Sequence, residues 1–397
     1  MNNKKKRLLI GITGGIAAYK IPLLIRLLKK NNYDTKVVIT RAAKNLVGED
    51  ALRTISKNPV FNDDCSSYYD MNHITLAEWA DYFVICPATA NTIAKIAHGI
   101  ADNLLTTLAL SFKGPILVAP AMNKVMWNNA ATQSNTVILQ QRGVRVLPVG
   151  KGALACGDEG EGRMLSPETI FEYIQGADLP QCFTGKKVVI SSGPTVEPID
   201  AVRVITNRSS GKMGAALAGA ALCMDADVTV ISGPAETPLP EGTEVHYVQT
   251  FLDMAHQINT HYQNSDICIM AAAIGDFRVK SVESEKISRT KKNELTLHLK
   301  SNRDISADLG RAKSNQFLVC FSLEMPHNEK KAKDKMIKKG CDMMVYNEVD
   351  SSLGKDTSKI TLMFPQKKPV KFDTMDKREC AWKIMLNIAE AMDLLNG

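Results

Sequence analysis

Two glycine-containing polar segments of this sequence could bind anionic groups. Thr13-Gly14-Gly15 follows an apolar run at residues 7–12, and the segment NRSSGKMG, from Asn207 to Gly214, supplies two hydroxyls, two glycines and a lysine ahead of an alanine-rich stretch. Backbone N–H groups at the start of a helix suit a phosphate or an acyl phosphate. Neither segment has the spacing of a Walker A motif or of GxGxxG, so an ordinary glycine turn or helix cap remains an open alternative for each.

One histidine and one cysteine are candidates for proton transfer. His73 precedes a short amphipathic stretch, ITLAEWA, and could act as a general base, although a single histidine is more often structural. Cys156 lies among glycines in the segment 153–164, a composition typical of a mobile flap, so we expect it to be accessible and reactive. Cys86 and Cys268 lie inside apolar runs, and we expect both to be buried and inert.

Length and composition narrow the class of protein. The chain has 397 residues, of which 45% are hydrophobic and 23% are charged, as in globular proteins of two domains. No apolar run approaches the roughly 20 residues of a membrane span, and Thr13, Gly14 and Gly15 interrupt the apolar start, so neither a membrane partner nor secretion is expected. The nine cysteines form no CxxC pair, which predicts neither a zinc site nor a disulfide framework and favours the cytoplasm.

The net charge of +7 bears on the partners of the protein. A basic chain can bind nucleic acid, but here the charge is spread along the sequence without interleaved aromatic residues. Anionic small substrates explain the charge equally well, and no nucleic-acid partner is expected.

The first half of the chain alternates strand-like and helix-like segments. Residues 7–40 predict a strand, an amphipathic helix with Pro22 early in it, and a second strand. Further strands are predicted at 82–88, 115–121 and 144–149, with helical stretches between them. This pattern favours a parallel, doubly wound α/β sheet of Rossmann-like or flavodoxin-like type. The loops 87–91 and 119–123 then meet at the carboxyl edge of the sheet, where such folds bind ligands.

The second half repeats the alternation and predicts a second doubly wound, Rossmann-like domain. A strand ends near Ser191-Ser192-Gly193-Pro194-Thr195, a polar loop follows, and a helix is predicted at 211–224. Residues 176–181 break the preceding helix, which places the linker there and the two domains at 1–178 and 186–397. The strand at 359–365 and the closing helix within 373–395 carry no evident chemistry.

Several motifs, taken in order, carry a family resemblance. GGIAAYK, PATANT, ADNLL, APAMN and ACGxxGxGRM, with His73 between them, resemble the flavin-dependent cysteine decarboxylases that act on 4'-phosphopantothenoylcysteine. The motifs SSGPTxEPID and NRSSGKMG, with the later region of Asp276, Lys286 and Lys335, resemble phosphopantothenate–cysteine ligase. Together they cover almost the whole chain, which is similar to the bacterial bifunctional decarboxylase/ligase family of coenzyme A biosynthesis.

The resemblance of the first half implies an FMN-dependent decarboxylation. In this chemistry FMN oxidises the substrate thiol to a thioaldehyde, which places the carboxylate β to an electron sink. The resemblance implies proton transfer by His73, binding of the substrate carboxylate by Asn123 and proton donation by Cys156 during the final reduction. It also implies FMN contacts at Gly14, Gly15, Ile16, Thr40, Thr89, Ala90, Asn91, Thr92 and Ala121.

The resemblance of the second half implies that CTP activates the substrate carboxylate as an acyl-cytidylate with release of pyrophosphate, after which the amine of cysteine displaces CMP. Arg203 and Asn207 would hold the acyl and phosphate region, with Asn207 and Lys286 in the catalytic group, and Mg²⁺ would accompany the triphosphate. The implied CTP site consists of Asp276, Lys286, Asn302, Asp304, Ile305, Phe321, Lys335 and Lys339. Without the resemblance, the lysine-rich stretch 328–340 indicates a solvated basic helix on which Lys335 and Lys339 share one face.

The resemblance also implies a homo-oligomer, with trimers of the flavin domain and dimers of the ligase domain giving a possible dodecamer. Two related classes compete with the enzyme: regulatory proteins that bind FMN and partners without turnover, and flavin prenyltransferases. The combination of His73, Asn123 and Cys156 argues against both. The sequence leaves the ligands of a metal unknown.

Overall fold

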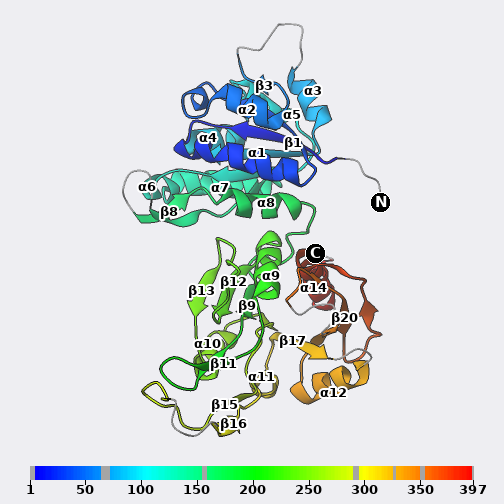
Figure 1. Ribbon diagram of the computed structural model, residues 1–397. Helices are drawn as coiled ribbons and strands as arrows, with labels where there is room; N and C mark the ends of the chain where they lie inside the picture. Colours follow the sequence, from blue (N-terminus) through cyan, green and yellow to red (C-terminus); the bar gives the residue numbers. More distant parts are fainter. Residues whose placement is uncertain are drawn as a thin grey trace. The chain divides into compact units, whose positions relative to one another are not determined.

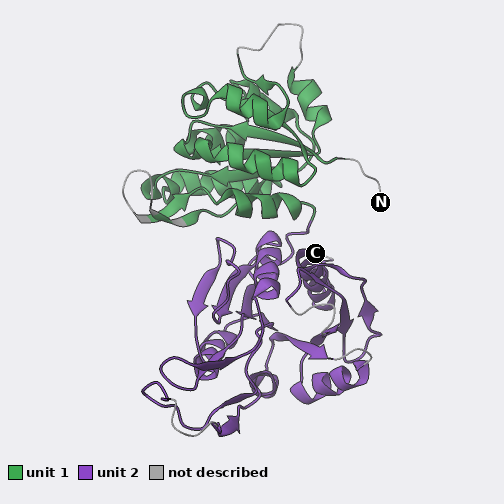
Figure 2. Cartoon of the chain, in the orientation of Figure 1, with its two compact units in different colours: residues 1–178 green, residues 179–397 purple. Residues whose placement is uncertain are grey.

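The computed structural model describes residues 5–63, 72–153, 159–288, 295–324, 328–348 and 354–395. The chain divides into two compact units, residues 1–178 and residues 179–397 (Figure 2). Each unit contains one large sheet flanked by helices (Figure 1). Within the described residues, no helix is long and apolar enough to cross a membrane.

The first unit is built on a sheet of six parallel strands. Their order across the sheet is β3 (Val60–Phe61), β2 (Asp34–Ile39), β1 (Arg7–Ile12), β4 (Tyr82–Ala88), β5 (Ile116–Pro120) and β6 (Arg145–Val146). This 3-2-1-4-5-6 order is that of the Rossmann fold and differs from the flavodoxin order, which the sequence left open. The order reverses between β1 and β4, and ligands of such sheets bind at that point.

Burial on both faces explains why these strands appear in the sequence as continuous apolar runs. All seven residues of β4 are buried, and Phe83 and Ile85 pack in one cluster with Ile93, Leu105 and Leu139 from the covering helices. The helices of this unit are α1 (Ile21–Lys30), α2 (Glu49–Ser56), α3 (Asn72–Trp79), α4 (Ala90–His98), α5 (Leu104–Ser111), α6 (Lys124–Trp127), α7 (Ala130–Gln141) and α8 (Pro167–Gln175). Cys86 is buried as predicted, and burial raises the pKa of its thiol to about 12.

Three details of the first unit differ from the sequence interpretation. Residues Ile16–Lys20 form a 3₁₀ helix, and α1 begins only at Ile21, because Pro22 has no N–H to continue an α-helical ladder from Ala18. His73 lies within α3 and not ahead of it. The glycine-rich segment contains an antiparallel pair, β7 (Gly150–Ala153) and β8 (Glu159–Arg163), and Cys156 lies outside the described residues.

The second unit is built on an eight-stranded sheet with the same reversal, here between β9 and β14. Six strands are parallel, and the last two are antiparallel to their neighbours. The order is β13 (Glu244–Tyr247), β12 (Asp227–Ser232), β9 (Lys187–Ser192), β14 (Ile267–Met270), β17 (Phe317–Glu324), β18 (Met343–Glu348), β20 (Ile360–Met363) and β21 (Val370–Lys371). Two doubly wound units confirm the predicted α/β class. Cys268 in β14 is buried, as predicted, and burial raises its pKa.

The helices of the second unit pack their apolar faces on this sheet. Phe251 and Ile258 from one helix and Met336 from another share a buried cluster with strand residues such as Leu318. The helices are α9 (Lys212–Cys223), α10 (Phe251–Tyr262), α11 (Ile305–Ala312), α12 (Glu329–Lys339) and α14 (Lys377–Ala391).

Short antiparallel strand pairs were missed by the sequence interpretation. The segment read as a polar loop contains β10 (Val196–Pro198) paired with β11 (Val204–Thr206), and a second pair joins β15 (Phe277–Val279) to β16 (Leu299–Ser301). A two-residue pair joins β19 (Thr357–Ser358) to β22 (Met375–Asp376). Strands of two or three residues are too short to show a period-two pattern. Ser191 and Ser192 belong to β9, so the loop after this strand begins at Gly193.

Candidate active sites

The first candidate site lies where the carboxyl ends of β1, β4 and β5 meet. A cavity of about 420 Å³ opens there, next to the reversal of the strand order. Seven residues implied by the resemblance line it: Gly14, Gly15, Ile16, Thr89, Ala90, Ala121 and Asn123. Its remaining lining residues were given no role in the sequence analysis, although all but Met126 belong to the motifs quoted there: Ala17, Tyr19, Lys20, Met122, Met126, Gly162, Arg163 and Met164.

Thr13 joins the two loops that form the floor of this cavity. Its hydroxyl donates to the carbonyl oxygen of Pro87 at 2.7 Å and accepts from the backbone N–H of Thr89 at 3.1 Å. Thr13 is 1% exposed, so no water replaces these bonds. The turn after β1 and the turn after β4 are therefore held together by one buried side chain.

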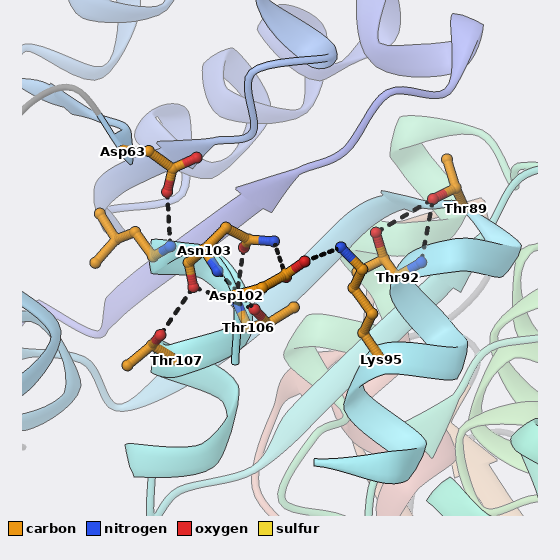
Figure 3. Close-up of polar contacts among 9 residues, drawn as sticks. Asp63, Thr89, Thr92, Lys95, Asp102, Asn103, Thr106 and Thr107 are labelled. Atoms are coloured by element: carbon orange, nitrogen blue, oxygen red, sulfur yellow. Dashed lines mark hydrogen bonds and ion pairs between the residues drawn. The ribbon is translucent and has the colours of Figure 1, made fainter. Parts of the chain in front are cut away.

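Thr89 also starts α4. Its hydroxyl accepts from the backbone N–H of Thr92 at 3.3 Å and lies 3.2 Å from the Thr92 hydroxyl (Figure 3). This cap turns the first backbone amides of α4 toward the end of the strand, where they suit an anionic group. Thr92 is buried, Asn91 is exposed, and Thr40 donates to the carbonyl of Ile12; these three implied FMN contacts do not line the cavity within the described residues.

The ADNLL motif joins two helices beside the cavity. Asp102 forms an ion pair with Lys95 of α4 at 2.5 Å, and Asn103 caps α5 by accepting from Thr106 N–H at 3.0 Å (Figure 3). The Asp63 carboxylate accepts from the N–H of Leu104 at 2.7 Å. These contacts hold the start of α5 against the end of α4, and none of these residues lines the cavity in the described part of the chain.

Asn123 is placed at the cavity by the start of α6. Its side-chain oxygen accepts from the N–H of Met126 at 2.8 Å, which leaves its Nδ2 group as a donor for a carboxylate. The β7–β8 pair packs on the same loop, because Gly162 O accepts from Met122 N at 2.9 Å. A Cβ atom on Gly162 would lie 2.4 Å from the Met122 carbonyl oxygen, so only glycine fits there. His73, half-buried in α3, does not line this cavity within the described residues.

The second candidate site lies at the carboxyl ends of β9, β14 and β17. Two adjoining cavities, of about 680 Å³ and about 200 Å³, share Arg208, Ala272, Ala273, Phe321 and Leu323 and therefore form one cleft. The larger cavity brings together seven residues implied by the resemblance: Asn207, Asp276, Asn302, Asp304, Ile305, Phe321 and Lys339.

Hydrogen bonds fix the polar residues of the larger cavity. Asn207 Nδ2 donates to the carbonyls of Ala273 and Ile274 at 3.1 and 3.2 Å, which ties the segment before α9 to the end of β14. Asp304 caps α11 and forms an ion pair with Lys339 at 3.4 Å. Two carboxylates, of Asp276 and Asp304, thus share a cavity with an ammonium group.

Comparisons with known proteins find relatives for both units of the chain. Residues 1–177 match the family model "Flavoprotein", and residues 183–392 match the "DNA/pantothenate metabolism flavoprotein C-terminal domain". The chain is 40% identical over 348 residues to the coenzyme A biosynthesis bifunctional protein CoaBC of Vibrio cholerae serotype O1, covering 87% of each chain. It is 37% identical over 398 residues to CoaBC of Bacillus subtilis, covering 98% of this chain and 97% of that protein.

The chain belongs to the CoaBC family. CoaBC of Escherichia coli K12 is also similar, at 39% identity over 350 residues that cover 87% of this chain and 86% of that protein. The family assignment confirms the resemblance read from the motifs, and it identifies the first unit as a flavoprotein domain.

In this CoaBC-family chain, the side chain of Arg203 contacts Asp200 and Ile287 and does not line the cleft in the described part of the chain. Its guanidinium pairs with the Asp200 carboxylate, whose side chain is 0% exposed, and donates to the Ile287 carbonyl at 2.8 Å. The Arg203 guanidinium, helped by backbone N–H donors, holds the pKa of Asp200 well below its usual range. Because Ile287 N–H also donates to Asp200 at 3.0 Å, this pair anchors the loop that carries the exposed Lys286.

Lys335 and Lys339, expected to share one face, have different partners. Lys335 pairs with Glu324 of β17, as does Lys331 at 3.0 Å, whereas Lys339 lines the cleft. Burial alone would raise the pKa of Glu324, but the hydrogen bonds from the two lysines lower it. Lys286, Arg203 and Lys335 therefore do not line the cleft within the described residues of this single chain.

Proposed function

We propose that this chain is a bifunctional enzyme that joins 4'-phosphopantothenate to cysteine with CTP and then decarboxylates the product to 4'-phosphopantetheine. The observation that carries the proposal is family membership along nearly the whole chain, together with two separate sites built from the motif residues. The reactions follow each other, since the product of the ligase is the substrate of the decarboxylase.

The ligase site must activate a carboxylate that would otherwise not react with an amine. Attack of the carboxylate on the α-phosphate of CTP forms an acyl-cytidylate and releases pyrophosphate, and the amine of cysteine then displaces CMP. We assign Asn207 to the acyl group and Lys286 and Lys339 to negative charge on the phosphates. Asp276 and Asp304 offer the oxygen ligands that Mg²⁺ prefers beside a triphosphate.

The other residues proposed for the ligase site support its backbone, supply apolar surface or pair with carboxylates. Asn302 Nδ2 donates to the Gly275 carbonyl at 2.7 Å and so supports the segment next to Asp276, while Ile305 and Phe321 supply apolar surface in the same cavity. Arg203 and Lys335 remain proposed substrate contacts, although each is already paired with a carboxylate.

The cavity of the first unit fits FMN by its size and by the chemistry of its lining. Its volume of about 420 Å³ lies in the range of small-molecule sites, and apolar residues such as Met122 and Met164 suit a flat ring system. Backbone amides and hydroxyls at Gly14 and Thr89 suit its phosphate. FMN would supply the oxidation of the substrate thiol that makes loss of carbon dioxide feasible, and the later return of these electrons.

The protein groups of this reaction have distinct proposed tasks. Asn123, with its oxygen used by α6, would direct its Nδ2 donor at the substrate carboxylate. His73 would transfer a proton during oxidation, and Cys156 would donate the proton that accompanies the final reduction. The FMN contacts proposed beyond the cavity lining are Thr40, Asn91 and Thr92. We further propose a cytoplasmic homo-oligomer of trimeric flavin domains and dimeric ligase domains.

Mass spectrometry of products tests the proposal. The purified chain is incubated with 4'-phosphopantothenate, cysteine, Mg²⁺ and each nucleoside triphosphate in turn. We expect CMP, pyrophosphate, carbon dioxide and 4'-phosphopantetheine with CTP. A yellow protein that forms no product in any mixture would indicate a flavin-binding regulatory protein, and a prenylated flavin would indicate a prenyltransferase; either result refutes the proposal.

A further inference from the structure

The smaller cavity of the ligase cleft receives basic side chains from two segments that are distant in the sequence. Arg208, Ser209, Ser210 and Lys212 come from the segment that leads into α9, whereas Lys377 is the first residue of α14. The two helices pack against each other. A region that carried no evident chemistry in the sequence therefore contributes an ammonium group to the cleft.

The two lysines differ in their partners. Lys212 Nζ forms an ion pair with Asp356 at 2.5 Å, and the Asp356 side chain is 83% exposed. Lys377 is half-buried, and among the described residues no ion pair involves its ammonium group. Burial and the neighbouring charge of Lys212 lower the pKa of Lys377, and the negative charge of Asp356 only partly opposes them. The folded protein thus keeps two cations close together, and the exposed carboxylate of Asp356 is paired with Lys212.

An anion bound in this cavity would offset the positive charges of Lys212 and Lys377. An exposed ion pair such as Lys212–Asp356 contributes little to stability, so a ligand carrying more charge can take the place of Asp356 at low cost. The serine hydroxyls of the same cavity are additional donors for oxygen atoms of the ligand. Glycine at position 214 allows the start of α9 to pack closely on β9. A Cβ atom there would lie 2.2 Å from the Ser192 hydroxyl oxygen, so any larger residue would push the helix away from the strand.

We propose that Lys377 and Lys212 together bind a phosphate group of a substrate in this cavity. The inference rests on the proposed function, in which CTP and 4'-phosphopantothenate both carry phosphate. The cavity joins the larger one through Arg208 and Phe321, so a phosphorylated molecule can extend from one into the other. Lys377 is then a binding residue of the ligase, and Asp356 competes with the ligand for Lys212.

Isothermal titration of the full chain tests the proposal with three probes: inorganic pyrophosphate, CTP with Mg²⁺, and 4'-phosphopantothenate. Loss of one charged hydrogen bond to phosphate corresponds to about a tenfold rise in the dissociation constant. We expect this rise for Lys377→Gln with at least one probe, and the affected probe identifies which phosphate is held. Lys377→Arg should retain most of the affinity, and Lys383→Gln, elsewhere on α14, serves as the matched control.

Stability separates a binding role from a structural one. Because Lys377 is half-buried beside Lys212, its replacement by glutamine should leave the melting temperature unchanged or raise it. The proposal is overturned if Lys377→Gln binds all three probes as the wild type does, or if it binds them no more weakly than Lys383→Gln.

A second variant keeps the test decisive if Lys377→Gln does not fold. Asp356→Asn removes the competing carboxylate and should tighten pyrophosphate binding about two- to threefold. Unchanged binding by this variant would count against the proposal. A wild-type chain that forms no ligated product would refute the proposed function, whereas the titration with pyrophosphate examines Lys377 and Lys212 independently of turnover.

Discussion

Replacement of Thr13 by valine should loosen the proposed flavin site without changing its shape. Valine has nearly the same volume, so no cavity forms, but the hydroxyl that joins the two loops is lost. The Pro87 carbonyl keeps a bond from the Thr13 backbone N–H at 3.3 Å. The part-buried N–H of Thr89 loses the acceptor that the Thr13 hydroxyl provides.

The cost follows from that unsatisfied donor. Loss of this part-buried hydrogen bond costs about 0.5–1.5 kcal/mol, which for a domain of this size lowers the melting temperature by roughly 1 to 6 °C. Gly14, Gly15 and Thr89 line the cavity, so a displaced Thr89 loop also weakens flavin binding. If the binding free energy of FMN becomes less favourable by about 1.4 kcal/mol, the dissociation constant of FMN rises about tenfold.

Two measurements on the full chain check this prediction. Fluorescence titration gives the dissociation constant for FMN, and circular dichroism on heating gives the melting temperature. Thr13→Ser is the matched control, because it keeps Oγ and loses only a methyl group. If the valine variant matches the serine variant in both measurements, the hydroxyl does not hold the two loops together and the reasoning is wrong.

Four further predictions concern the proposed chemistry and the pH dependence of stability. His73→Asn should abolish carbon dioxide release while cysteine ligation persists, because the sites lie in separate units; equal loss of both activities would contradict this. Cys156→Ser should bind FMN yet stop at the oxidised enethiol, and a normal yield of 4'-phosphopantetheine would refute the assignment. Lys286→Gln should slow cysteine transfer about a hundredfold and let acyl-cytidylate accumulate. Quenched-flow mass spectrometry measures both, and transfer at the wild-type rate would refute the assignment. Because Arg203 lowers the pKa of Asp200 below 3.8, the contribution of this carboxylate to the free energy of unfolding should stay level above about pH 5 and decline as the pH falls below about 4; Asp200→Asn should make the acid decline in denaturant titrations shallower, and an equally steep decline would contradict this.

The sequence was sufficient to predict the α/β class and the edge of the sheet at which the proposed flavin site lies. Strands buried on both faces are continuous apolar runs, and loops at the carboxyl ends of neighbouring parallel strands must meet. Thr13-Gly14-Gly15 and the loop at Thr89 therefore lie close together because each follows the carboxyl end of its own strand and the two strands are parallel neighbours. The motif residues needed no long-range information to be placed at one edge.

The order of the strands and the partners of the charged side chains depended on the tertiary structure. Lys335 and Lys339 are equivalent on an isolated helix, but Lys335 pairs with Glu324 of the neighbouring strand, whereas Lys339 pairs with Asp304 and lines the cleft. Arg203 pairs with a buried carboxylate, which no pattern in the sequence distinguishes from an exposed one. Lys377 reaches the ligase cleft only because α14 packs on α9. Local sequence determines which segments form helices and strands, whereas the environment of each charge depends on residues distant in the chain.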